Sequence, residues 1–219
     1  MSRHQSQAHV AEAALGESLL RQRKARPADF GLFLLKFLAK GRTISSAVPS
    51  SRSLVEGVLK LVDFGRPSTI VELGAGTGPV TEQIVERLGP QHRFVAVEND
   101  ADFCAILRRR FPETALLEMD ATLVAEPLAR MGIHKVDYVL SGLPTPSLPR
   151  RSQINLWRWL RSALGPNGLF IQITVAPLFF KPFYDRLFEH VEYRMVWRNV
   201  PPGGVYYCSR PRQVLHLAK

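Results

Sequence analysis

Short apolar runs alternate with longer amphipathic stretches through the middle of this 219-residue chain. The runs are rich in Val, Ile, Leu and Phe, as is typical of strands buried on both faces of a parallel sheet. They predict strands over residues 69–73, 93–98, 115–120, 136–141 and 169–174. Between them, apolar positions recur every three or four residues and predict helices over 80–88, 102–111, 122–131 and 153–164. Because strand–helix–strand crossovers have one hand, this alternation predicts a doubly wound α/β sheet with ligands at the carboxyl ends of its strands.

Further elements flank this alternating region. A helix near 52–64 precedes the first strand, and a helix over 182–190 follows the fifth. A strand over 192–198 then pairs with either 205–209 or 213–217. The expected fold class is therefore α/β, with a mostly parallel, seven-stranded sheet and an N-terminal helical extension.

The segment 30–42 is unusually aromatic for a helix, and Asp29 supplies an N-cap for it. At about 100° per residue its apolar positions share one face, and cations border that face. The membrane-contact candidates are Phe33, Lys36, Phe37, Lys40 and Arg42. Rings in the acyl boundary and lysines among anionic headgroups are typical of a helix lying in a lipid interface. A core helix is the alternative, because Leu32 and Leu35 widen the apolar face. We divide the chain into a helical, membrane-binding extension over 1–50 and a domain over 51–219.

The net charge of +10 is concentrated in the two flanks of the chain. Residues 1–60 carry ten Lys/Arg against four Asp/Glu, residues 61–149 eight against twelve, and residues 150–219 eleven against three. Basic flanks attract polyanions, either nucleic acid or an anionic membrane surface, and charge alone does not separate these two. The sequence has no membrane-spanning apolar run or signal peptide, and Cys104 and Cys208 are too few for a disulfide framework. We therefore expect a cytoplasmic protein with two reduced cysteines.

Residues 71–78, VELGAGTG, lie between the first strand and the next helix. Gly74, Gly76 and Gly78 let the backbone turn sharply and come within contact distance of a ligand. The spacing is G-x-G-x-G and not the dinucleotide pattern G-x-G-x-x-G, and the carboxylate of Glu72 works against a bound phosphate. An acidic neighbour favours a cationic ligand, and S-adenosylmethionine carries a sulfonium and an ammonium group. The stretch resembles motif I of class I methyltransferases; a glycine turn without a ligand is the alternative.

Polar side chains end the next two strands. Glu98 ends the second strand, where a carboxylate can accept hydrogen bonds from both ribose hydroxyls of a nucleotide. An exposed strand-end charge is the alternative. Asn99 follows and is expected to border the adenine. Asp120, followed by Ala121, ends the third strand, where methyltransferases commonly bind the adenine amino group; a plain N-cap is the alternative.

Ser141-Gly142-Leu143-Pro144 ends the fourth strand, where the reacting atom is expected to lie. Amine-directed nucleic-acid methyltransferases place an Asn/Asp-Pro-Pro-Tyr-like tetrad here, which binds the target amine and stacks its base. This chain lacks those side chains, which argues against a base as substrate. Ser141 offers a backbone carbonyl and Gly142 allows a substrate to approach closely; a turn without a function is the alternative.

Aromatic residues downstream include two candidates for a headgroup pocket, Tyr184 and Tyr206. Ring faces hold a methylated ammonium through cation–π attraction worth about 0.5–2 kcal/mol each. Most rings in this part of the chain are expected in the core, and the pattern identifies no general base.

Over residues 29–210 the chain resembles the bacterial phospholipid N-methyltransferases, which convert phosphatidylethanolamine to phosphatidylcholine. The likeness rests on the Phe/Leu/Lys helix, the AVPSSR connection at 47–52, VELGAGTG, Glu98 and the SGLP end of the fourth strand. It implies S-adenosylmethionine as cofactor, S-adenosylhomocysteine as product and no metal. The implied partners are phosphatidylethanolamine, its mono- and dimethylated forms and an anionic phospholipid surface, without nucleic acid. The implied location is peripheral, on the inner face of the cytoplasmic membrane.

The resemblance makes Glu72, Gly74, Gly76 and Glu98 cofactor residues and the five positions named in the aromatic helix membrane contacts. The full cofactor set that we expect adds Thr77, Gly78, Asn99, Asp120 and Ala121. Two other functions compete with lipid methylation. One is an rRNA adenine N6-methyltransferase, disfavoured by the missing tetrad. The other is a non-catalytic membrane-binding module, disfavoured by the intact glycines and acidic residues.

Overall fold

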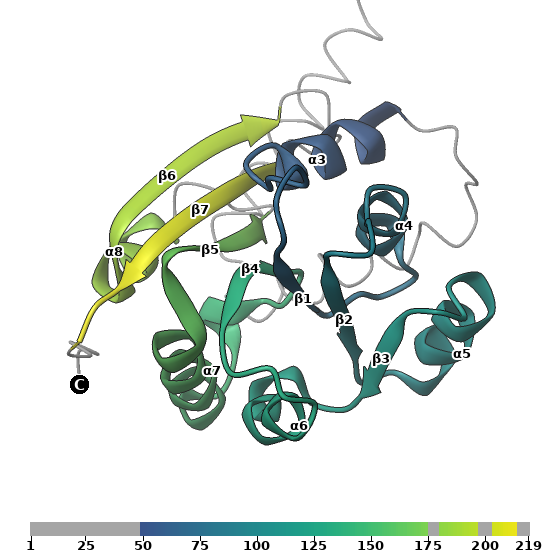
Figure 1. Ribbon diagram of the computed structural model, residues 1–219. Helices are drawn as coiled ribbons and strands as arrows, with labels where there is room; N and C mark the ends of the chain where they lie inside the picture. Colours follow the sequence, from purple (N-terminus) through teal and green to yellow (C-terminus); the bar gives the residue numbers. More distant parts are fainter. Residues whose placement is uncertain (1–48, 175–179, 197–202, 214–219) are drawn as a thin grey trace, which may run out of the picture.

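The structure is a computed structural model that describes residues 49–174, 180–196 and 203–213. Within these residues, seven strands form one sheet in the order β3-β2-β1-β4-β5-β7-β6 (Figure 1). The strands are β1 (Thr69–Leu73), β2 (Arg93–Glu98), β3 (Ala115–Glu118), β4 (Val136–Ser141), β5 (Leu164–Thr174), β6 (Phe188–Val196) and β7 (Gly203–Pro211). Strands β1 to β5 are parallel, and β7 is antiparallel to both β5 and β6. This confirms the predicted α/β fold class.

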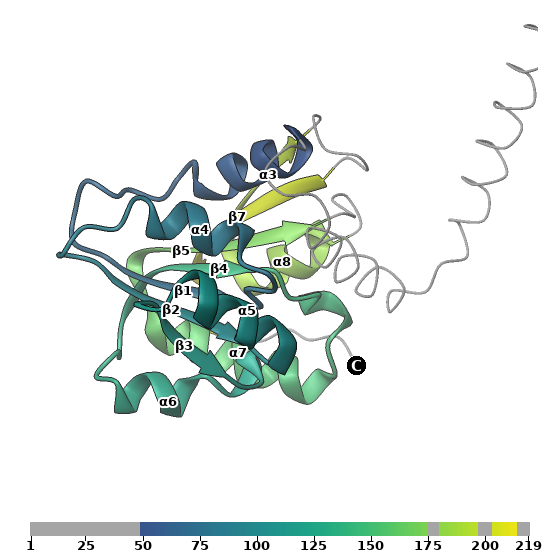
Figure 2. The ribbon, with the colours of Figure 1, turned by 90° about the vertical axis from the view of Figure 1, so that its right-hand side faces the viewer.

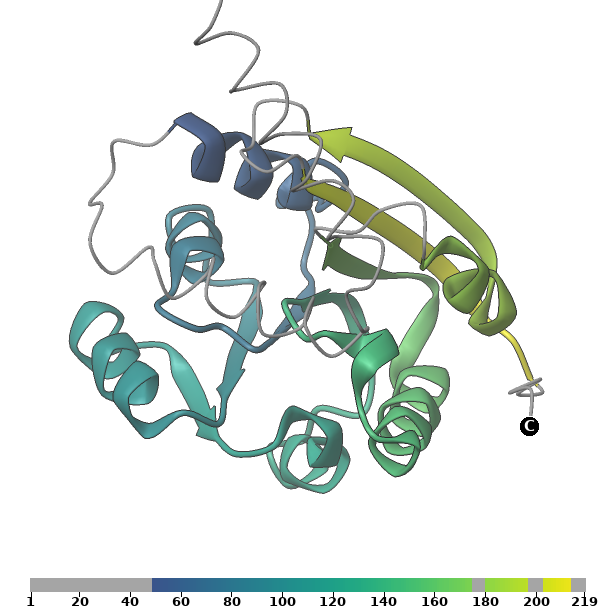
Figure 3. The same ribbon diagram turned by 180° about the vertical axis from the view of Figure 1, so that it is seen from behind.

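Helices cover both faces of the sheet (Figures 2 and 3). One layer contains α3 (Pro49–Leu59), α4 (Pro79–Val85) and α5 (Ala101–Arg110). The other contains α6 (Ala125–Arg130), α7 (Arg150–Ala163) and α8 (Lys181–Leu187). Two short 3₁₀ helices, η1 (Ala121–Leu123) and η2 (Thr145–Ser147), follow β3 and β4. No helix among the described residues is long and apolar enough to cross a membrane.

The central strands are buried on both faces, which explains their continuous apolar runs. In β1, Ile70 packs with the α3–α4–α5 layer and Val71 with the opposite layer, and both side chains are fully buried. Helix α5 begins at a side-chain cap, because Asp100 accepts a hydrogen bond from the backbone N–H of Phe103 at 3.0 Å. The apolar runs are visible in the sequence, and β1, β2 and β4 have the bounds that these runs predict.

Strand β5 begins five residues earlier than the apolar pattern predicts. Leu164 already pairs with Val136, and the next pair is Tyr138 with Leu169. Residues 165–168 of β5 therefore interrupt the regular pairing with β4. The glycines and proline of this segment hid the start of the strand, since they are typical of turns.

The end of α8 also differs from the prediction, because this helix stops at Leu187 and β6 starts at Phe188. The Phe188 ring is buried and contacts Trp157 and Phe170, at centroid distances of 5.5 and 5.6 Å. Packing against these distant residues places Phe188 in the sheet. Smaller differences are the earlier ends of α3, α4 and β3.

Strand β6 pairs with Gly203–Pro211, which agrees with the first of the two predicted pairings. The proposed membrane contacts Phe33, Lys36, Phe37, Lys40 and Arg42 lie outside the described residues, as does nearly all of the proposed extension over 1–50. The domain division therefore stays a prediction.

Candidate active site

The glycine-rich turn lies between β1 and α4, beside the carboxyl end of β2. The backbone N–H groups of Gly74 and Ala75 donate to the carbonyl oxygen of Val97, at 2.8 and 3.2 Å. Gly74, Gly76 and Gly78 have φ values of +74°, +58° and +88°. These left-handed conformations are costly for residues with a Cβ, which explains the repeated glycine.

The surroundings of the last two glycines differ. A Cβ on Gly76 would meet nothing within 4 Å, so this side of the turn is open to a ligand. A Cβ on Gly78 would lie 2.7 Å from Phe111 Cε2 and 2.8 Å from Leu107 Cδ2. Gly76 thus permits close approach from outside, whereas Gly78 permits the packing of α5 against the turn.

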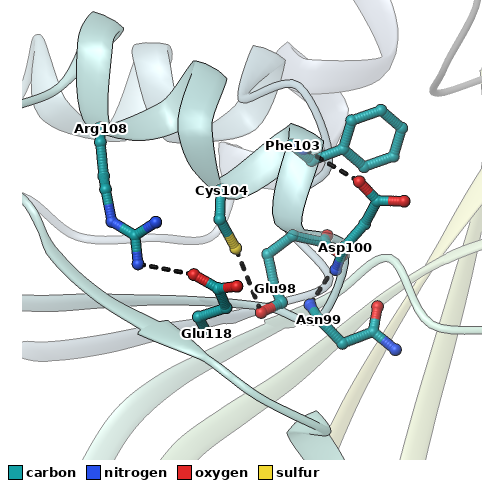
Figure 4. A network of polar contacts seen from close by, with 7 residues as sticks. All are labelled: Glu98, Asn99, Asp100, Phe103, Cys104, Arg108 and Glu118. Carbon is teal, nitrogen blue, oxygen red and sulfur yellow. Dashed lines mark hydrogen bonds and ion pairs between the residues drawn. The ribbon is translucent and has the colours of Figure 1, made fainter.

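Glu98, at the end of β2, is buried and holds the turn in place. Its Oε2 accepts the Gly76 N–H at 2.7 Å, and its Oε1 accepts the N–H groups of Asn99 and Asp100 at 2.8 and 3.0 Å. Figure 4 shows Glu98 at the end of β2 with its neighbours Asn99, Asp100 and Cys104. Glu98 therefore has a positioning role that the sequence did not reveal, and its contact with ribose stays a prediction.

The predicted adenine contacts lie at the ends of β2 and β3. The backbone N–H of Met119 donates to the carbonyl of Glu98 at 2.8 Å, which brings these strand ends together. Asn99 is exposed, whereas Asp120 accepts the Thr122 N–H at 2.8 Å and caps η1. Ala121 is buried in η1. The N-cap alternative for Asp120 is thus present, and its contact with adenine stays a prediction.

Glu72 is 4% exposed and accepts a hydrogen bond from the Thr81 hydroxyl at 2.6 Å. Burial, with a smaller contribution from the charge of Glu98, raises the pKa of Glu72 to about 8. No ion pair to Glu72 or Glu98 occurs in the described part of the chain. Two buried carboxylates without a cation beside an open glycine turn suit a positively charged ligand.

One cavity brings two of the cofactor candidates, Glu72 and Gly74, together with two of the reaction candidates, Ser141 and Gly142. Its lining comes from β1, the glycine turn, α4, the end of β4 and β5, and comprises Glu72, Gly74, Ala75, Pro79, Val80, Leu140, Ser141, Gly142 and Ile173. Thr77, also predicted, is buried in the turn. The Gly142 N–H donates to the Leu73 carbonyl at 2.9 Å, which ties the end of β4 to that of β1.

Two residues beside this cavity escaped the sequence analysis. The Gln172 amide nitrogen lies 3.0 Å from the Ser141 carbonyl oxygen and 2.8 Å from that of Leu143. The Thr145 hydroxyl donates to the Gln172 side-chain oxygen at 2.8 Å. The sequence feature that could have identified Gln172 is its amide side chain within the mostly apolar run 169–174.

Tyr184 and Tyr206 lie in the core between β7 and α8, with ring centroids 4.8 Å apart. Both side chains are buried, and burial raises the pKa of each phenol. The Tyr206 hydroxyl has no hydrogen-bond partner among the described residues. Contact of either ring with a headgroup stays a prediction. Within the described ranges, no group of three or more His, Cys, Asp or Glu could hold a metal ion.

We expect the affinity for S-adenosylhomocysteine to increase between pH 6 and pH 8. The ligand's ammonium group requires an ionised Glu72, whose pKa is about 8. Each pH unit below that value therefore weakens binding by up to about tenfold. Calorimetric titration measures the profile, and Glu72→Gln should bind weakly without this pH dependence. A flat wild-type profile would show that Glu72 does not meet the ligand's cation.

The same raised pKa affects the free protein. Between pH 4.5 and pH 8 the folded state holds a proton on Glu72 that the unfolded chain has lost. Its stability contribution is therefore complete below about pH 4.5 and is lost as the pH rises through about 8. Unfolding of the unliganded wild type and of Glu72→Gln across this range separates this contribution from other ionisable groups.

Comparison with known proteins gives a partial and a nearly complete match. The family model described as ribosomal RNA adenine dimethylase matches residues 46–125. The ribosomal RNA small subunit methyltransferase A of Hydrogenobaculum sp. is 28% identical over 83 residues, covering 38% of this chain and 32% of that protein. The ornithine lipid N-methyltransferase of Singulisphaera acidiphila is 40% identical over 183 residues, covering 82% of this chain and 95% of that enzyme.

Solved structures share the fold. Human Methyltransferase-like protein 13 in complex with SAH has a TM-score of 0.53 and 19% identity, covering 78% of this chain and 84% of that one. The Burkholderia thailandensis 1,6-didemethyltoxoflavin-N1-methyltransferase, with S-adenosylhomocysteine bound, has a TM-score of 0.54 and 15% identity, covering 85% and 92%. The chain has a seven-stranded sheet, the glycine turn and 40% identity across nearly all of the Singulisphaera enzyme. It therefore belongs to the family of that enzyme, within the class I S-adenosylmethionine-dependent methyltransferases.

Proposed function

We propose that this protein N-methylates the amine of a lipid headgroup at an anionic membrane surface. The observation that carries the proposal is the 40% identity to an ornithine lipid N-methyltransferase over 95% of that enzyme. A match of this extent cannot be confined to the glycine turn and its neighbours, so it also includes residues that follow β3.

The residues around the glycine turn fit the cofactor that this family requires. S-adenosylmethionine, when bound, supplies an activated methyl group on a cationic sulfur. Gly76 leaves the turn open, since a Cβ there would meet no atom within 4 Å. Glu72 supplies a buried carboxylate for the ligand's ammonium group. Glu98 holds the turn through Gly76 and retains acceptor capacity for a ribose hydroxyl, because a carboxylate offers about four acceptor positions and three are used.

The end of β4 is the proposed binding place for the acceptor nitrogen. Ser141 and Gly142 share a cavity with Glu72, so the backbone carbonyls at the end of β4 are available to an amine beside the cofactor site. An ammonium has no lone pair and must lose a proton before it can accept a methyl group. Partial desolvation in this cavity would lower the amine's pKa and assist that loss.

The likeness to rRNA adenine methyltransferases supports the cofactor site more than the substrate. The matching family model covers residues 46–125, which include the glycine turn, Glu98 and Asp120. It ends before β4, so it does not include Ser141 and Gly142. The absence of the Asn/Asp-Pro-Pro-Tyr-like side chains at the end of β4 also disfavours a base.

Charge supports a polyanionic surface as the place of action. Helix α7 carries four arginines and no acidic residue, and all four are exposed: Arg150, Arg151, Arg158 and Arg161. Together with the cations of the segment 30–42 they provide electrostatic attraction to anionic lipid. The aromatic residues of that segment, among them Phe33 and Phe37, would add burial in the acyl boundary.

For the headgroup we propose ornithine lipid first, because a relative that matches this chain over 95% of its own length is named for methylating it. Phosphatidylethanolamine and its mono- and dimethylated forms are the second candidate, from the resemblance of VELGAGTG and the AVPSSR connection to phospholipid N-methyltransferases. Both substrates present an amine at the membrane surface, so the same cavity can serve either.

The test supplies purified protein and labelled methyl donor with one acceptor at a time. The acceptors are anionic vesicles containing ornithine lipid, anionic vesicles containing phosphatidylethanolamine, and unmodified small-subunit rRNA. We expect label in lipid, with ornithine lipid preferred. Label in rRNA alone would overturn the proposal, and label in none would favour a non-catalytic membrane-binding module.

A separate experiment tests membrane binding by the segment 30–42. Phe33→Asp combined with Phe37→Asp should abolish pelleting with anionic vesicles while thermal stability stays within a few degrees of wild type. A matched control adds the same charge at two exposed polar positions, Gln91→Asp with Asn167→Asp, and should still pellet. Loss of the fold in the Phe variant alone would instead indicate that this segment packs on the core.

A further inference from the structure

Two buried polar side chains, Gln172 of β5 and Thr145 of η2, contact each other beside the end of β4. Gln172 is 1% exposed. Its side-chain oxygen accepts from the Thr145 hydroxyl at 2.8 Å, and its amide nitrogen lies 3.0 Å from the Ser141 carbonyl and 2.8 Å from the Leu143 carbonyl. Buried polar groups need such partners, because leaving one unpaired costs about 1–3 kcal/mol.

The direction of these hydrogen bonds follows from the donors available. A threonine hydroxyl has one proton, and that of Thr145 is donated to Gln172. Because Thr145 donates to the side-chain oxygen of Gln172, the amide is oriented with its nitrogen toward the backbone carbonyls at the end of β4.

The amide nitrogen has more acceptors than protons. Besides the carbonyls of Ser141 and Leu143, that of Ile173 lies 2.8 Å away. A primary amide donates only two hydrogens, so three carbonyl oxygens share them. Each carbonyl oxygen has two lone pairs, so the carbonyls at the end of β4 retain capacity to accept an N–H from a bound amine without displacing Gln172.

We propose that Gln172 is a positioning residue for the methyl acceptor, an inference that rests on the proposed N-methyltransferase function. It fixes the carbonyls of Ser141 and Leu143, on either side of Gly142, beside the cavity that Ser141, Gly142 and Glu72 line. Thr145 acts through Gln172, by setting the orientation of its amide.

The test removes one polar group at a time. Thr145→Val keeps the shape and deletes the hydroxyl, Thr145→Ser keeps the hydroxyl, and Gln172→Leu deletes the amide. We expect kcat on lipid to fall at least tenfold in Gln172→Leu and Thr145→Val. Thr145→Ser should stay within about twofold of wild type. Thr145→Val should add little in the Gln172→Leu background, because Thr145 acts through Gln172.

Two readouts separate positioning from a merely structural role. The dissociation constant for S-adenosylhomocysteine should change less than twofold, since Glu72 and the glycine turn are untouched. Amide hydrogen exchange should quicken at Gly142 and Leu143 and stay unchanged in β2. If affinity for S-adenosylhomocysteine falls in step with kcat, the network is only part of the core and the proposal is wrong. Full activity in Thr145→Val would also overturn it.

The proposal can still be tested if Gln172→Leu does not fold or if the wild-type protein methylates no lipid. Should Gln172→Leu fail to fold, the Thr145→Val and Thr145→Ser pair still decides, because these variants differ from wild type by a single small group. Should the wild-type protein methylate no lipid, the proposed function fails by itself. Hydrogen exchange in the same variants then still shows whether the network holds the end of β4, and unchanged exchange in Thr145→Val would overturn that part.

Discussion

Gly78→Ala is expected to lower the free energy of unfolding by about 2–4 kcal/mol. The new Cβ would lie 2.7 Å from Phe111 Cε2 and 2.8 Å from Leu107 Cδ2, so α5 must move or the turn must distort. The φ of +88° adds a conformational cost, because residues with a Cβ rarely adopt it. Denaturant unfolding followed by circular dichroism measures the change, with a shifted midpoint at an unaltered slope.

Gly76→Ala is the matched control for this prediction. It also sits at positive φ, +58°, but its Cβ would meet nothing within 4 Å. We expect a loss of only about 1 kcal/mol in stability, from the backbone conformation alone. Cofactor affinity should nevertheless fall at least tenfold, because the methyl group points to the open side of the turn. Equal destabilisation by the two substitutions would show that packing of α5 is not what requires Gly78.

Glu98→Ala is expected to have the second large effect, on both stability and cofactor affinity. The substitution removes the acceptor of three backbone N–H groups, those of Gly76, Asn99 and Asp100. An unpaired buried N–H costs about 1–3 kcal/mol, and Gly76 is the one of the three whose contact with Glu98 is fully buried. We therefore expect about 2–3 kcal/mol lower stability and at least tenfold weaker binding of S-adenosylhomocysteine.

Glu118→Gln provides the control, since Glu118 pairs in register with Glu98 on the neighbouring strand (Figure 4). Its carboxylate pairs with Arg108 at 2.7 Å, and both side chains are substantially exposed. Exposed ion pairs contribute about 0–1 kcal/mol, so this variant should remain close to wild type in stability and affinity. Weakened binding by Glu98→Ala with unchanged stability would show that Glu98 acts on the ligand and not on the turn.

Much of the cofactor half of the fold could be predicted from the sequence because its signals are local. The bounds of β1, β2 and β4 follow from apolar runs that are buried on both faces. The glycine pattern and the carboxylates of Glu72 and Glu98 are also short-range features, and the structure brings them together around one turn. The fold class was therefore predictable from the alternation of strands and helices.

The acceptor half depended on contacts between residues far apart in the chain. Phe188 belongs to a strand because it packs on Trp157 and Phe170, although the sequence around it reads as helix. Tyr184 was predicted as a pocket aromatic, but only the fold reveals that its ring is buried in the core against Tyr206. The periodicity of one segment cannot predict contacts between residues that are far apart in the chain.

The sequence by itself determined the α/β fold, the glycine turn and the acidic residues that suit a cationic cofactor, because each of these is specified by neighbours along the chain. Only the tertiary structure decided that Glu98 holds the turn, that the pKa of Glu72 rises on burial, and that Gln172 reaches the end of β4. Those properties arise when separate strands pack side by side, since burial and hydrogen-bond partners are set by residues that are distant in sequence and close in space.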